Sequence, residues 1–164
     1  AKKLENFTNK EQLNYFAKTF AILEISTNYL FEIAKLRAWQ LLWGNLQKAY
    51  NVQDILPSKV DICFSKDAYT QESSNNMIAA SSMSISAILG GASRITVRPA
   101  SNENESFHKR ISRNVLHLAD LESGFRQVAD PAAGSYYLET LTDKIADSAW
   151  NIFIKKQEPG ATNF

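Results

Sequence analysis

The sequence has a single cysteine, Cys63, among 164 residues. It can form no internal disulfide and no multi-cysteine zinc site, which excludes a disulfide-stabilised secreted scaffold and favours a reducing compartment. Long apolar runs are also missing, since none approaches the roughly 20 residues that a membrane-spanning helix needs. The first residues lack the basic and apolar regions of a secretory signal. We therefore expect a cytoplasmic protein without a membrane partner.

Neither sign of charge is in excess. The 18 basic and 17 acidic residues give a formal net charge of +1. This balance provides no general attraction to nucleic acid or to an anionic membrane, so neither is expected as a partner. With 45% hydrophobic and 21% charged residues, the composition is that of a globular chain, and it excludes a disordered or fibrous one.

Motifs for phosphate or metal binding are absent as well. No GxGxxG or Walker-type loop occurs, and Gly90-Gly91 ends a predicted helix instead of opening one. His108 and His117 are nine positions apart on one predicted helix and therefore face opposite sides of it, which excludes a metal-binding pair. We expect His108 at the surface, His117 packed or capping, and Cys63 buried and inert. The residues by themselves nominate no catalytic group and no metal ligand.

What is present is an alternation of helical and extended patterns. Strands are expected at 60–64 and 95–97, and helices over 8–25, from about 28 past 42, over 75–89, over 105–121 and from 140 onward. Thr8 with Glu11 and Thr140 with Asp143 match capping patterns, and Asn75 could begin its helix. Two short strands separated by a helix imply parallel βαβ packing. Because parallel sheets are normally larger and buried on both faces, we expect a piece of an α/β fold, or an α-rich domain built from such a piece.

Arg37 lies within the apolar stripe of the predicted helix that follows residue 28. A charged group there is costly unless it reaches water or finds a partner. Either its stem follows the stripe while the guanidinium reaches solvent, or the guanidinium points inward and organises a carboxylate.

Several motifs in a fixed order resemble methylmalonyl-CoA mutases. They are residues 31–38 (FEIAKLRA) with Leu42-Trp43, Gly90-Gly91 followed by the strand 95–97, residues 110–114 (RISRN), residues 122–124 (ESG), and residues 128–136 (VADPAAGSY) with 139–142. The match spans roughly residues 10–158. It places the chain in the later part of the family's (β/α)₈ substrate barrel.

The resemblance implies a vitamin B12-dependent carbon-skeleton isomerase that interconverts methylmalonyl-CoA and succinyl-CoA. A whole barrel needs about 200 residues or more, so residues 1–164 are expected to be a single partial domain, a fragment of a TIM barrel. The Asp-x-His-x-x-Gly signature of the family's cobalamin-binding domain is absent from this sequence. Adenosylcobalamin is thus expected in the parent enzyme and not on this chain alone. The resemblance also implies that Arg37 forms a structural ion pair in the outer layer of the barrel.

Two departures favour the small, non-catalytic subunit of the heterodimeric enzymes. Catalytic subunits have an arginine and a polar run where this chain reads DICFSKDAY at 61–69, and a histidine where it reads ITVRP at 95–99. Phe64 and Thr96 stand at or near their polar positions. A large catalytic mutase subunit is the expected partner, and the fragment could also self-associate.

Three residues are candidate cofactor contacts by resemblance only. Gly91, Glu122 and Gly124 correspond to places where a catalytic barrel approaches the corrin. Two alternatives remain open: an active mutase whose other domains lie outside this sequence, and a barrel-derived module that binds acyl-CoA or protein without an enzymatic role. The exact acyl-CoA substrate and the oligomeric state do not follow from these residues.

Overall fold

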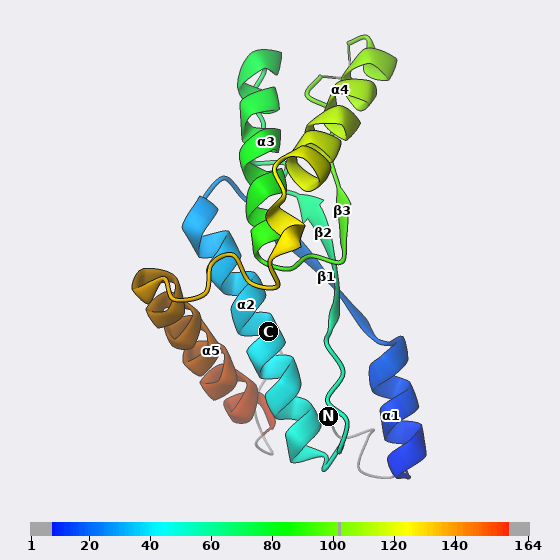
Figure 1. Cartoon of the computed structure of the whole chain (residues 1–164), viewed down its shortest axis with the longest axis vertical. Coiled ribbons are helices and arrows are strands. Elements are labelled where there is room, and N and C mark those ends of the chain that lie inside the picture. The colour runs from blue at the N-terminus through cyan, green and yellow to red at the C-terminus, as the bar shows by residue number, and fades with distance from the viewer. Residues whose placement is uncertain (1–7, 102, 158–164) are drawn as a thin grey trace.

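The computed structural model describes residues 8–101 and 103–157. Its elements, in order, are α1 (Asn9–Lys18), β1 (Phe20–Ile25), α2 (Tyr29–Ala49), β2 (Lys59–Phe64), α3 (Ser73–Leu89), β3 (Arg94–Thr96), α4 (Glu105–His117) and α5 (Tyr136–Gln157). A π-helical turn at Leu118–Glu122 and a 3₁₀ turn at Phe125–Gln127 connect α4 to α5. Figure 1 shows this arrangement.

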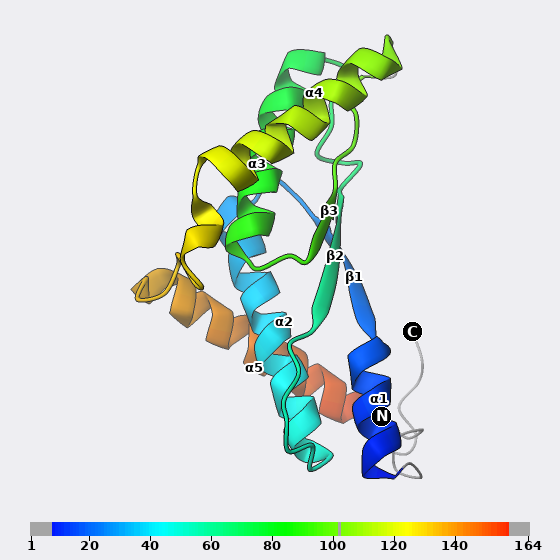
Figure 2. The ribbon, with the colours of Figure 1, turned by 45° about the vertical axis from the view of Figure 1, so that its right-hand side comes forward.

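The strands form one parallel sheet in the order β1-β2-β3. Helices α2 and α3 connect consecutive strands and pack on the same face, where Ile25, Leu36, Ile62 and Met83 form the centre of the core. Figure 2 shows these helices on one side of the sheet. Consecutive parallel strands with every helix on one face are compatible with a segment of a (β/α)₈ barrel, whereas doubly wound sheets have helices on both faces.

The prediction of one helix over residues 8–25 is wrong. The capping pattern forms, since the backbone N–H of Thr8 donates to Glu11 Oε2 at 2.8 Å, but α1 ends at Lys18 and the chain continues as β1. The expected two strands are therefore three. Phe20 fits a helical stripe in the sequence, yet the alternation that places Leu23 and Ile25 toward the core has a period of two. Pairing with β2 decides between the helical and the extended pattern, because it forms the backbone hydrogen bonds of β1 and buries Ile25.

Other helix ends also differ from the sequence-based expectation. Helix α3 begins at Ser73, and Glu72 at its N-cap accepts a hydrogen bond from the Ser74 N–H. Helix α5 begins at Tyr136, so Thr140 lies inside it and donates its hydroxyl to the carbonyl of Tyr136 at 2.8 Å instead of capping. The Gly90-Gly91 stop of α3 is confirmed.

Helix α5 lies against α2, on the side away from the sheet (Figure 1). A second small core joins the two helices and includes Ile33, Ala34, Ala132 and Leu138. The turn at 130–134 is thereby fixed to the first half of α2. The chain thus has an inner layer, the sheet, and outer layers of helices on one side of it.

Candidate functional site

The carboxyl ends of the three strands meet at one edge of the sheet. In βα-barrels this edge is the place of active sites, because the loops that follow the strands gather there. In the described part of the chain those loops are residues 26–28, 65–72, and 97–101 with 103–104. The polar groups at this edge are therefore the first candidates for a functional site.

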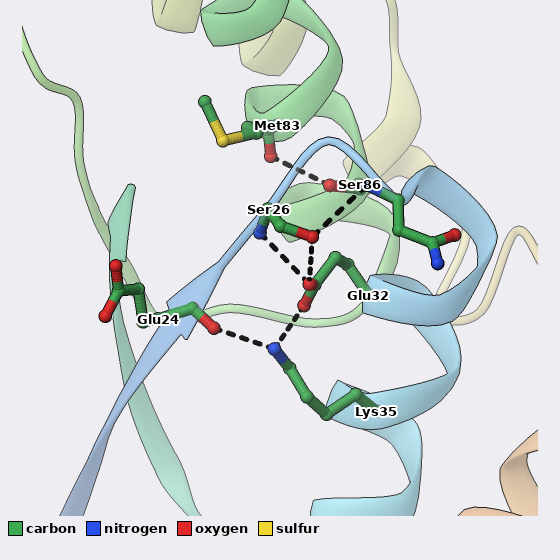
Figure 3. Close-up of polar contacts among 7 residues, drawn as sticks. Glu24, Ser26, Glu32, Lys35, Met83 and Ser86 are labelled. Atoms are coloured by element: carbon green, nitrogen blue, oxygen red, sulfur yellow. Dashed lines mark hydrogen bonds and ion pairs between the residues drawn. The ribbon is translucent and has the colours of Figure 1, made fainter. Parts of the chain in front are cut away.

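A buried carboxylate closes the loop after β1. Glu32 is 3% exposed, and its Oε1 accepts hydrogen bonds from the Ser26 N–H at 3.0 Å and the Ser26 hydroxyl at 2.8 Å. Lys35 pairs with Oε2 of Glu32 and donates to the carbonyl of Glu24 at 2.7 Å. Figure 3 shows Lys35 between the end of β1 and Glu32. Because each charged group has a partner, this cluster stabilises the loop and leaves no free carboxylate for acid–base chemistry.

The loops after β2 and β3 are tied together by two side chains. Asn76, 3% exposed, donates to the carbonyls of Thr70 and Ala100, both at 2.8 Å, and accepts from the Thr70 N–H at 2.7 Å. The hydroxyl of Tyr69 donates to the carbonyl of Arg98 at 2.9 Å. Burial raises the pKa of Tyr69 to about 12, so its phenol remains a proton donor in this bond at neutral pH.

The other face of the sheet is left open by the described residues. Phe20 is 53% exposed, Ile22 is 64% exposed, and Cys63 is exposed. The prediction of a buried Cys63 is therefore wrong: alternation along β2 buries Val60, Ile62 and Phe64 and turns Cys63 outward. At the middle of this open face Arg94 donates from Nε to Asp61 Oδ1 at 3.2 Å, and its Nη2 lies 2.9 Å from Oδ2.

The candidate cofactor contacts lie elsewhere in the fold. Gly91 precedes β3 and therefore lies at the edge where the strands begin, with a φ of +82°. Glu122 ends the π-helical turn and Gly124 follows it, and the turns on either side of Gly124 lie beside the C-terminal end of α3 (Figure 1). Gly91 lines a hollow of about 300 Å³ with Arg37 and Asp130, and neither Glu122 nor Gly124 lines it. Their contact with a corrin stays a prediction.

The histidines are placed the opposite way from the expectation. His117 is exposed, and His108 is half-buried with a buried Nδ1 that has no hydrogen-bond partner. The reason is that the buried side of α4 carries Ser112, whose hydroxyl donates to the carbonyl of Arg98 at 3.2 Å, whereas Phe107 and Leu118 are 39% and 50% exposed. Within residues 8–101 and 103–157, no cluster of histidine, cysteine and carboxylate side chains could hold a metal ion. No helix of that part of the chain is long and apolar enough to cross a membrane.

Arg37 takes the inward orientation of its two interpretations. Its Nη1 lies 2.7 Å from Asp130 Oδ1, and only 19% of its side chain is exposed. The same oxygen accepts from the Ala132 N–H at 3.1 Å. Asp130 thus connects the turn before α5 to α2. Sequence reasoning missed Glu32 and Asn76, although the Glu32–Lys35 spacing of three residues was a readable signal for an ion pair.

Comparisons with known proteins agree with the motifs. The family model described as methylmalonyl-CoA mutase matches residues 9–163. The chain belongs to the methylmalonyl-CoA mutase family. It is 33% identical over 145 residues to a methylmalonyl-CoA mutase small subunit of Porphyromonas gingivalis, covering 83% of this chain and 23% of that protein.

Two further relatives bear on the type of subunit. A methylmalonyl-CoA mutase of Rhizobium meliloti is 33% identical over 139 residues, covering 78% of this chain and 19% of that protein. A small subunit of Propionibacterium freudenreichii is 32% identical over 134 residues, covering 78% and 21%. The chain therefore spans about a fifth of the length of these relatives. Overall identity does not separate small subunits from other mutases, so that distinction depends on individual residues.

The Arg37–Asp130 pair gives a testable expectation for this family segment. Arg37→Met and Asp130→Asn should each lower the free energy of unfolding by about 1 kcal/mol, with a coupling energy of about 0.5–1 kcal/mol that shrinks in high salt because Asp130 is partly exposed. Asn at position 130 can still accept from the Ala132 N–H, so the pair of variants isolates the charge. Urea unfolding in a double-mutant cycle measures the coupling, and strictly additive effects would contradict a working ion pair.

Proposed function

We propose that this chain is part of the non-catalytic small subunit of a B12-dependent methylmalonyl-CoA mutase. In that subunit it forms the late part of a (β/α)₈ barrel and assembles with a large catalytic subunit in the cytoplasm. The observation that carries the proposal is the Asp61–Arg94 ion pair across the middle of the open face. In a closed barrel this face would point toward the axis.

The chemistry of that face disfavours an acyl-CoA running along it. The Asp61 carboxylate engages Nε and Nη2 of Arg94, so an acyl-CoA would meet a neutral pair instead of an unpaired guanidinium, although the arginine side chain is 73% exposed. Ile22 is paired in register with Asp61 and adds a branched apolar side chain to the same level of the sheet. An acyl-CoA lying along the barrel axis would need small side chains or unpaired polar groups at this level of the sheet. A neutralised ion pair occupies that space without offering the ligand new hydrogen-bond partners.

The sequence departures support the same proposal. Asp61 and Cys63 occupy the stretch in which the resemblance places an arginine and polar residues of catalytic subunits, and Thr96 stands near the position of their histidine. Relatives named as small subunits imply a larger partner. The single cysteine supports a reducing compartment.

The mutase family uses adenosylcobalamin, which supplies radical chemistry where it is bound. Gly91 lines a hollow of about 300 Å³ that Glu122 and Gly124 do not line, so this hollow does not join the three candidate contacts. No reaction step is therefore assigned to residues of this chain. The cofactor contact of Gly91, Glu122 and Gly124 stays a prediction about the assembled enzyme.

Titration calorimetry tests the proposal. Methylmalonyl-CoA and adenosylcobalamin should each give no binding heat with this chain, while an intact catalytic mutase in the same cell gives heat as the positive control. The Asp61→Ala variant frees the Arg94 guanidinium and should gain weak, salt-sensitive binding of the CoA ester. Micromolar binding of methylmalonyl-CoA by the unaltered chain would overturn the proposal and favour the acyl-CoA-binding alternative.

A further inference from the structure

We draw no further inference here: the strongest candidate, the apolar groove of about 350 Å³ between the C-terminal halves of α2 and α5 that is lined by Trp39, Trp43 and Trp150, carries none, because nothing in residues 8–101 and 103–157 shows what covers it.

Discussion

Replacing Gly90 by alanine should destabilise this chain by about 2–3 kcal/mol, as overpacking of a well-filled core typically does. A Cβ at Gly90 would stand 2.6 Å from Cδ1 and 2.8 Å from Cβ of Leu36, and 3.1 Å from the carbonyl oxygen of Ser86. Leu36 is 1% exposed and belongs to the main core, so it cannot move aside without disturbing its neighbours. Thermal unfolding should show a midpoint lowered by roughly 5–10 °C for a chain of this length.

Gly91 is the natural control for this substitution. It has a φ of +82° but open space where a Cβ would stand, so Gly91→Ala should cost only about 1 kcal/mol of backbone strain. In a Leu36→Ala background, the further cost of Gly90→Ala should be smaller but should not vanish, because that substitution removes the Cδ1 of Leu36 and leaves its Cβ. Equal costs for Gly90→Ala in both backgrounds would contradict the close approach of α2 and α3.

Removing the amide of Asn76 should cost about 3 kcal/mol of stability. The Asn76→Ala variant deprives the Thr70 N–H of its acceptor and the carbonyls of Thr70 and Ala100 of their donor, all at a side chain that is 3% exposed. Buried groups left without partners cost about 1–3 kcal/mol each, less whatever water recovers. Urea unfolding measures the loss.

A matched control and a local measurement distinguish a specific role of Asn76 in joining the loops after β2 and β3 from a general loss of stability. Asn75→Ala, one position away at an exposed site of the same helix, should change stability by less than about 0.5 kcal/mol. Hydrogen exchange should speed up at the amides of 65–72 in the Asn76 variant before it does so in β2. Uniform acceleration across the sheet would show that Asn76 does not hold these loops specifically.

Features set by residues close in the sequence were predicted correctly, whereas features set by contacts between distant segments were not. The helix stop at Gly90-Gly91, the break before α2 and the strands near 60–64 and 95–97 were predicted, because turn residues and short apolar runs act locally. The strand β1 was not predicted, since Phe20 fits the apolar spacing of a helix as well as that of a strand. Only pairing with a strand almost 40 residues away in the sequence decided it.

Side-chain placement shows the same division. Cys63 was expected inside because free cysteines usually are, yet the direction of the pleat in β2 turns it to the open face. The histidines exchanged their expected environments because the side of α4 that turns inward is the one that carries Ser112, one turn from His108. Neither outcome could be read from the sequence, since each depends on which side of an element meets the rest of the molecule.

The sequence by itself determined the family of this protein, because its motifs lie in a fixed order and each depends on residue identity alone. It also determined that Arg37 needed either solvent or a partner. The tertiary structure decided which carboxylate that partner is, which face of the sheet is left open, and that Asp61 and Arg94 neutralise each other on it. These outcomes arise from contacts between distant segments, and the free energy of such contacts exists only once the chain has folded.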